Sequence, residues 1–420
     1  MRQSPLRFLH ITTFYPPYSF GGDAIYVSRL ANALARDGHL VDVIHCIDSY
    51  EMLSGNREVK PEPSVHPNLN VFGLRSGFGA LSPLLTQQTG APFLKRAQID
   101  KIVQGKSYDV VQFHNISLIG PEILNLAPNA DMIKLYMALE YWLVCPTHML
   151  WKFNERLCES PECITCVLKA RRPPQIWRYF GTLQRAAAQV DQFIAPSECA
   201  ARLHAERGFS APFEYLPLFT EIDEGQDPRQ LSRPHVEPYF LFAGRLEKLK
   251  GIDTLISAWE RNQGADLLIA GDGTEATSLR ARAAGNPRIV FLGSVPQARM
   301  KALYAHALAC IVPSLFWEPF GLVAIEALAN RTPVIAHRIG GPAEIVEQSG
   351  GGLLYDSGQE LVDALEKIAS DSSLRENLAE RGYAACRELW SREAHLKMYY
   401  ELIERTAARK FSALGAAQSI

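Results

Sequence analysis

Residues 318–326, Glu-Pro-Phe-Gly-Leu-Val-Ala-Ile-Glu, carry two glutamates at the ends of an apolar segment. The apolar run just before them, Ala309 to Val312, reads as a buried strand. Pro319 suits the opening of a helix, because its fixed φ is already helical and its missing N–H would be unpaired there anyway. The pattern therefore predicts a strand-to-helix corner at Glu318, with Glu326 about two turns into the helix.

The backbone amides of Phe320, Gly321 and Leu322 are predicted to point between these two carboxylates, in the geometry that receives a phosphate. Two glutamates eight residues apart mean little alone, since helices carry many solvated glutamates. The recurrence of strand, glycine corner and helix over residues 333–344 favours a site.

Length and composition fit a large globular protein. A chain of 420 residues is too long for one ordinary core, so two domains are expected. The net charge of -2 gives no case for nucleic-acid binding. No apolar run approaches the roughly 20 residues that span a bilayer. The start, Met1 to Leu6, offers no signal-peptide core, so a cytoplasmic protein is expected.

The two halves of the chain repeat one scheme of alternating strands and helices, which predicts parallel sheets. In the first half the expected elements are a strand at 6–11, a loop at 15–22, a helix at 23–37 and strands at 40–44, 110–113 and 133–139. In the second half they are a strand at 239–243, a loop at 244–250, a helix at 252–259, a strand at 267–270 and a glycine turn at 271–273.

The joint order of these motifs resembles the retaining GT-B glycosyltransferases of family 4, also called glycosyl transferases group 1. The motifs that carry the resemblance are the Gly21-Gly22 loop, Asp109 to His114, Ala195 to Glu198, Gly244-Arg245-Leu246 with Lys250-Gly251, Gly271-Asp272-Gly273, and Glu318 to Glu326. Each motif alone is weak, but their order is specific and covers nearly the whole chain. The resemblance implies an α/β fold in which two Rossmann-like doubly wound domains face each other across a cleft.

We expect an N-terminal acceptor-side domain at residues 1–222, with a cysteine-rich insertion at about 140–180. A polar, proline-bearing linker follows at 223–238, and a nucleotide-sugar donor domain at 239–391. The tail at 392–420 is expected to form a helix that packs back onto the first domain.

Two cations follow a predicted strand in the second half. Arg245 and Lys250 are placed to offset the charge that builds on a leaving nucleotide diphosphate. A solvated surface cation is the alternative for each. The resemblance implies that Glu326 binds the ribose hydroxyls and that Glu318 lies beside the donor sugar.

Four glycines are further candidates. Gly21 and Gly22 open a helix, where unobstructed amides suit the distal phosphate or the transferred sugar. Gly271 and Gly273 would let the backbone approach the base, although tight turns alone also explain them.

His114 ends a predicted strand, and the resemblance places a histidine there, close to the sugar and the acceptor. A core histidine that caps the strand is the alternative. The family often has another histidine where this chain has Gln112, which leaves His114 as the better candidate.

Retention requires same-face attack or a covalent intermediate on an enzyme carboxylate. Glu140 is the one tempting carboxylate in the first half. The family precedent is same-face substitution, in which the leaving phosphate helps to deprotonate the acceptor. This scheme requires no divalent cation, and the chain has no acidic diphosphate-metal motif.

Four cysteines, Cys145, Cys158, Cys163 and Cys166, crowd the insertion. In a cytosolic chain this favours a structural zinc site over disulfides, with four independent thiols as the alternative. The stretch at 169–179 that follows interleaves basic and aromatic residues. These residues would suit docking on the anionic cytoplasmic face of an inner membrane or binding of a lipid-linked acceptor. A solvated helix face explains the pattern equally well.

The sequence thus predicts an enzyme that moves a sugar from a UDP- or GDP-sugar, with retention, onto a glycan, lipid-linked or small-molecule acceptor in cell-surface polysaccharide or glycoconjugate biosynthesis. The alternatives are a non-catalytic nucleotide-sugar-binding subunit of a synthase and a GT-B sugar-nucleotide epimerase. The joint presence of Arg245, Lys250, Glu318 and Glu326 favours the enzyme.

Overall fold

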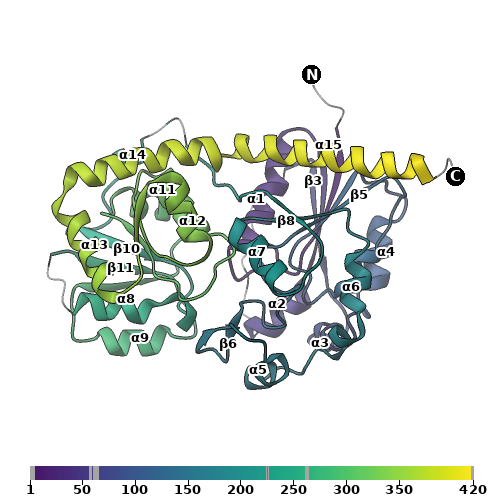
Figure 1. The fold of residues 1–420 in the computed structure, drawn as a ribbon, viewed down its shortest axis with the longest axis horizontal. Coiled ribbons are helices and arrows are strands. Elements are labelled where there is room, and N and C mark those ends of the chain that lie inside the picture. The colour runs from purple at the N-terminus through teal and green to yellow at the C-terminus, as the bar shows by residue number, and fades with distance from the viewer. Residues whose placement is uncertain are drawn as a thin grey trace.

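Short apolar runs in both halves of the chain form parallel strands, and the segments between them form helices that cover the sheets (Figure 1). The computed structural model describes residues 5–55, 59, 66–223, 225, 227–260 and 264–417. It contains one parallel sheet in each half of the chain and a short antiparallel hairpin in the insertion.

The first sheet has the strand order β3-β2-β1-β4-β5-β8-β9, with every pair parallel. Its strands are β1 (Arg7–Ile11), β2 (Leu40–Cys46), β3 (Leu69–Leu74), β4 (Val110–Phe113), β5 (Ile133–Met137), β8 (Gln192–Ala195) and β9 (Phe213–Tyr215). The helical segments of this half are α1 (Gly22–Arg36), α2 (Ile47–Ser54), α3 (Leu81–Thr89), α4 (Arg96–Val103), η1 (Pro121–Asn125), α5 (Cys163–Lys169), η2 (Ile176–Phe180), α6 (Thr182–Ala187) and α7 (Glu198–Glu206). The order reverses between β1 and β4, and ligands bind at such switch points, beyond the carboxyl ends of the strands.

The second sheet has the order β12-β11-β10-β13-β14-β15, again with every pair parallel. Its strands are β10 (Tyr239–Ala243), β11 (Asp266–Ala270), β12 (Ile289–Gly293), β13 (Cys310–Val312), β14 (Val334–His337) and β15 (Gly352–Tyr355). The helical segments are η3 (Pro228–Gln230), η4 (Lys248–Lys250), α8 (Ile252–Trp259), α9 (Ala276–Ala283), α10 (Gln297–Ala305), α11 (Leu322–Ala329), α12 (Gly340–Ser349), α13 (Gly358–Ser370) and α14 (Ser372–Leu389). The switch point lies between β10 and β13, so the loops after these two strands are the expected ligand loops.

The insertion between β5 and β8 reaches the second half of the chain. Its hairpin pairs β6 (Trp151–Lys152) with β7 (Arg156–Leu157). Trp151 packs in one buried cluster with Leu249 and Phe316, which belong to the loops after β10 and β13. The hairpin therefore contacts the loops after β10 and β13 of the second sheet.

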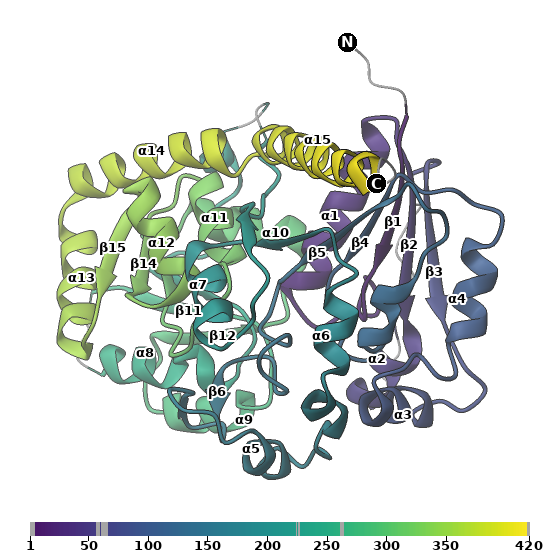
Figure 2. The ribbon, with the colours of Figure 1, turned by 45° about the vertical axis from the view of Figure 1, so that its right-hand side comes forward.

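The C-terminal helix α15 (Arg392–Ala417) follows α14 and runs from the second half across the first sheet (Figures 1 and 2). His395 Nδ1 lies 2.7 Å from the Pro217 carbonyl, and Lys410 Nζ donates to Asp191 at 2.8 Å. The Tyr399 hydroxyl donates to Gln112 at the centre of the first sheet. One buried apolar cluster includes residues of both sheets and of α15, so the two halves share a continuous core.

The start of α11 differs from the sequence prediction. The helix begins at Leu322, not at Pro319, and Gly321 before it has a φ of 133°. The Ser197 hydroxyl of the first half donates to the Pro319 carbonyl at 2.6 Å, and the Gly341 amide donates to the Glu318 carbonyl at 2.8 Å. These contacts hold residues 318–321 in a loop, so the predicted opening of a helix at Pro319 is wrong.

None of the helices in the described part of the chain is long and apolar enough to cross a membrane.

Candidate active site

The amino ends of two helices from different halves meet at the junction of the sheets. Gly22 is the first residue of α1 and Leu322 the first of α11, and a Cβ added to Gly22 would lie 3.0 Å from Leu322 Cδ1. The residues before both helices, Gly21 and Gly321, are glycines that offer no side chain to cap the first turn. Free amides and the positive end of each helix dipole therefore lie close to each other and favour an anion.

Lys250 and Glu318, which were both predicted as site residues, form an ion pair between the loops that precede α8 and α11. Lys250 ends η4 after β10, and its Nζ donates to Glu318 Oε1 at 2.6 Å. The ammonium also lies 5.3 Å from the centre of the Phe316 ring, and the Ser314 hydroxyl donates to the same carboxylate oxygen. Both side chains are mostly buried, so their orientation is fixed.

Arg245 lies in the same loop but is exposed, and its guanidinium has no hydrogen-bond or ion-pair partner among the residues that the structure describes. Its charge remains available for an anionic ligand, whereas the charge of Lys250 is balanced by Glu318.

Glu326 has a partner for each of its carboxylate oxygens. Arg29 of α1 donates to Oε1 at 2.5 Å, and the Tyr304 hydroxyl donates to Oε2 at 3.2 Å. Burial raises the pKa of Tyr304 well above its usual range, so this hydroxyl stays protonated. The Arg29 side chain is 9% exposed, and its Nη1 has no hydrogen-bond partner in the described part of the chain. Glu326 is therefore tied to the first half of the molecule.

Arg29 was missed by the sequence analysis, although its spacing carried a signal. It lies seven residues after Gly22, which puts both residues on one face of α1. A helix face that begins with a glycine predicted to bind a ligand and carries an arginine two turns later is a candidate for contact with the opposite half.

The glycine turn after β11 packs against the loop that carries Arg245. Gly271 has a φ of 147°, and a Cβ there would lie 1.8 Å from the Gly244 carbonyl oxygen. A Cβ on Gly273 would lie 2.4 Å from the Leu246 carbonyl oxygen. These close contacts explain why both positions need glycine, since the turn supports the loop rigidly. The approach of Gly271 and Gly273 to a nucleotide base stays a prediction.

His114 does not join the other predicted residues. It is 0% exposed, and its Nε2 lies 3.1 Å from His10 Nδ1 in the core. Burial lowers the pKa of His114 well below its usual range, and the neighbouring His10 lowers it further, so the ring is neutral. The position of His114 is that of a core histidine, which was the alternative interpretation. Contact of His114 with a sugar stays a prediction.

Both halves of the chain match known family descriptions. Residues 20–224 match Glycosyltransferase Family 4, and residues 223–385 match Glycosyl transferases group 1. A D-inositol 3-phosphate glycosyltransferase of Pseudarthrobacter chlorophenolicus is 32% identical over 447 aligned positions, which cover 96% of each chain. The chain belongs to glycosyltransferase family 4.

Solved structures with the same fold extend over nearly all of this glycosyltransferase. Sucrose-phosphate synthase of Thermosynechococcus elongatus has a TM-score of 0.72 at 22% identity and covers 96% of this chain and 100% of its own. Anabaena HepE in complex with UDP has a TM-score of 0.66 at 18% identity, with coverage of 95% and 100%. The fold is GT-B, with two Rossmann-like domains.

The four cysteines of the insertion are free thiols in this glycosyltransferase. Cys145 is buried, with Sγ 3.3 Å from the Thr147 hydroxyl, and Cys158 Sγ lies 3.7 Å from the Ser160 carbonyl. Within the described ranges, no group of three or more His, Cys, Asp or Glu side chains is arranged to hold a metal ion.

Burial raises the pKa of Cys158 and of Cys163, and the neighbouring Cys145 and Cys166 raise it further. The four thiols thus influence one another, and the predicted structural zinc site of Cys145, Cys158, Cys163 and Cys166 stays a prediction.

Proposed function

We propose that this glycosyltransferase moves a sugar from a UDP- or GDP-sugar, with retention of configuration, onto a glycan, lipid-linked or small-molecule acceptor in polysaccharide or glycoconjugate biosynthesis. The observation that carries the proposal is the approach of the amino ends of α1 and α11, with Gly22 against Leu322. Two uncapped helix ends beside Lys250 form an anion site built from both halves.

The diphosphate would lie between the amides of the Gly21-Gly22 and Gly321-Leu322 segments. Lys250 and Arg245 would stabilise the charge that grows on the leaving phosphate, where it matters most for the rate. Glu318 orients Lys250 through their 2.6 Å contact and would lie beside the sugar. The HepE complex, a structural neighbour that binds UDP, supports a uridine nucleotide as one donor class.

Glu326 would bind the ribose hydroxyls. Because both of its oxygens already have partners, the ribose must displace Arg29 or share the carboxylate with it. Donor binding is therefore coupled to the contact between α1 and α11.

Same-face substitution accounts for retention without a protein nucleophile. The bond from the anomeric carbon to the phosphate oxygen breaks, the acceptor oxygen bonds to that carbon, and the acceptor proton passes to the leaving phosphate. Glu140 Oε2 accepts a 2.5 Å hydrogen bond from the Trp142 amide and lies 3.2 Å from His148 Nδ1. Because these two contacts engage the carboxylate, they support a structural role for Glu140.

Thermal unfolding in the presence of a panel of nucleotide sugars tests the donor class, because a ligand of the folded state raises the midpoint by mass action. We expect one UDP- or GDP-sugar to raise the midpoint. The anomeric configuration of the product, read by NMR, then tests retention. An inverted product would contradict the same-face route. A donor that binds but never turns over would favour the non-catalytic subunit.

A further inference from the structure

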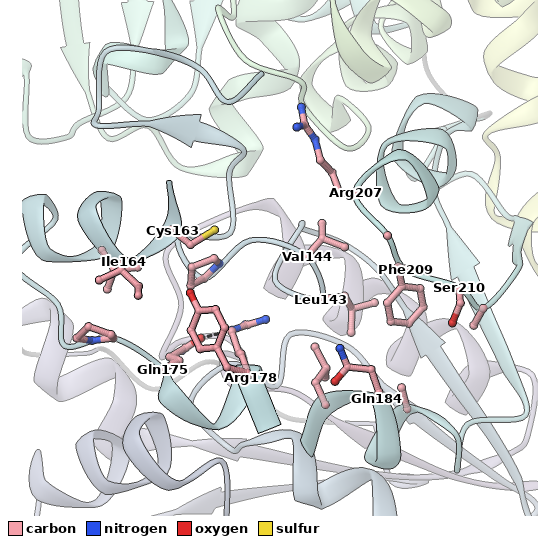
Figure 3. A pocket seen from close by; sticks show the side chains of 18 of the residues that line it. Leu143, Val144, Cys163, Ile164, Gln175, Arg178, Gln184, Arg207, Phe209 and Ser210 are labelled. Carbon is pink, nitrogen blue, oxygen red and sulfur yellow. Dashed lines mark hydrogen bonds between the residues drawn. The ribbon is translucent and has the colours of Figure 1, made fainter. Parts of the chain in front are cut away.

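A cavity of about 350 Å³ lies in the first half, between the insertion, α6 and the loop after α7 (Figure 3). Its volume is within the range of about 300–1,000 Å³ for small-molecule sites. Its lining includes none of the glycines, glutamates or cations that form the candidate active site. The cavity is therefore a separate feature that glycosyl transfer does not explain.

Most of the wall is apolar. Leu143, Val167 and Leu183 are buried residues that line it, and Phe209 closes one end (Figure 3). At the rim Ile164 is 52% exposed, although the side chain is fully apolar. A wall and rim of this kind suit a hydrocarbon chain, because covering them removes apolar surface from water.

Two cations, Arg178 and Arg207, interrupt the apolar wall. The Arg207 guanidinium donates to the carbonyls of Cys158 and Glu159, so Arg178 is the stronger candidate for an anion. The Arg178 guanidinium lies 4.8 Å from the ring centre of Trp142 and 4.9 Å from that of Trp177, and its Nε donates to Gln175 Oε1 at 2.5 Å. Its Nη2 is buried without a hydrogen-bond partner, and no carboxylate in the described part of the chain forms an ion pair with it. Burial lowers the pKa of Arg178 to about 10, so the group is charged at neutral pH.

The segment around the cavity is basic. Residues 163–190 contain Lys169, Arg171, Arg172, Arg178 and Arg185 and no aspartate or glutamate. Lys169 ends the rim helix α5 and pairs with Glu155 at 3.6 Å, whereas Arg171 and Arg172 after it are exposed. The positive charge of Arg171 and Arg172 attracts an anion toward the cavity.

We propose that this cavity binds a lipid phosphate, with the phosphate at Arg178 and the hydrocarbon chain along the wall of Leu143, Val167 and Leu183. Inorganic phosphate would leave the apolar wall uncovered. A neutral hydrocarbon would leave a buried guanidinium N–H unpaired, which is costly. A phosphate joined to an apolar chain satisfies both parts of the site.

Calorimetric titration of the full chain with dodecyl phosphate, below its micelle concentration, tests the proposal. We expect saturable binding to the wild type and at least about ten-fold weaker binding to Arg178→Met, the loss expected for one charge-assisted hydrogen bond. Arg280→Met is the matched control, because Arg280 also stacks on an aromatic ring, Phe291, at 4.7 Å but lies in the second half. It should bind like the wild type.

A second variant does not touch Arg178. Ala188 lines the cavity and is exposed, so Ala188→Trp should fill the space from the rim and abolish binding while the fold survives. Equal binding of dodecyl phosphate to wild type, Arg178→Met and Ala188→Trp would overturn the proposal. So would equal binding of dodecyltrimethylammonium, since a purely apolar site does not discriminate charge.

Co-sedimentation with vesicles separates two sources of the lipid phosphate. Retention on phosphatidylglycerol but not on phosphatidylcholine vesicles, lost in Arg178→Met, would support a bilayer phospholipid. Binding of dodecyl phosphate without retention on either vesicle would support a lipid phosphate taken up singly. Retention on both vesicle types that is unchanged in Arg178→Met would contradict a phosphate-specific cavity.

Discussion

Arg29 and Glu326 join the two halves of the glycosyltransferase at the position where the ribose is proposed to bind. The pair has a contact of 2.5 Å and joins residues 297 positions apart in the chain. Neither the contact nor the choice of partner could be read from the sequence, because helix spacing places Arg29 on a face without saying what the face meets. Glu318 and Glu326 themselves were identified as candidates from the motif that they bracket.

Arg29→Met should release Glu326 and strengthen nucleotide binding several-fold, because the ribose no longer competes with the guanidinium. The free energy of unfolding should fall by roughly 2 kcal/mol, less than the 3–5 kcal/mol of a fully buried pair, since Glu326 is partly exposed. Titration with UDP and urea unfolding measure the two effects.

Arg36→Met is the matched control on the same helix. Arg36 pairs with Glu221 at 3.3 Å on the surface, so its loss should change stability by less than about 1 kcal/mol and leave nucleotide binding unchanged. Weaker nucleotide binding by Arg29→Met would mean that Arg29 contacts the donor directly.

The buried pair of His10 and His114 predicts a loss of stability in acid. Burial lowers the pKa of His10 to about 3 and that of His114 well below 6.5, so the folded state excludes protons that the unfolded chain binds. The contribution of these two histidines to the free energy of unfolding is therefore fully present above about pH 6.5. It decreases as the pH falls toward their pKa values in the folded state. Each group contributes up to about 1.4 kcal/mol per pH unit in that window.

Urea unfolding of the wild type and of His114→Gln between pH 7.5 and 5.0 measures this slope. The variant should lose less stability on acidification than the wild type, because only one histidine of the pair remains that is neutral in the folded state and protonated in the unfolded chain. An identical pH dependence in both proteins would contradict the assignment of a neutral buried His114.

At the scale of the elements, apolar runs predicted the central strands well. The expected strands at 110–113 and 239–243 match β4 and β10, and the helix at 252–259 matches α8. The start of α11 was predicted wrongly, because the contact of Ser197 with the Pro319 carbonyl outweighs the local preference of proline. Local patterns thus located elements, whereas contacts between distant segments decided where this one begins.

The turn after β11 gives a prediction about its glycines. Gly271→Ala should destabilise the protein by about 3 kcal/mol or more, because its Cβ would lie 1.8 Å from the Gly244 carbonyl oxygen at a φ that alanine avoids. Gly285→Ala is the control, since a Cβ there meets nothing within 4 Å, and it should change stability by less than about 1 kcal/mol. Thermal unfolding compares the two, and equal midpoints would contradict the close packing of this turn.

For the whole molecule, the sequence identified two repeated α/β halves but not how their residues combine. Lys250 and Glu318 come from different loops of one sheet, whereas Gly22 and Leu322 begin helices in different halves of the chain. The sequence motif that contains His114 was as clear as the motifs of these four residues, yet His114 lies in the core with His10. A motif therefore identified candidate residues, and only the arrangement of both sheets separated those at the junction from those in the core.

The central claim is that the junction beside Lys250 binds a nucleoside diphosphate. Calorimetric titration with UDP and GDP tests it most directly, because binding requires neither the acceptor nor the transferred sugar. Lys250→Ala should weaken binding of the preferred nucleotide about 10- to 150-fold, the loss of one charge-assisted contact. Lys248→Ala, which removes an exposed cation two residues away in η4, should leave it unchanged. Unaltered binding by Lys250→Ala, or equal losses in both variants, would contradict the claim.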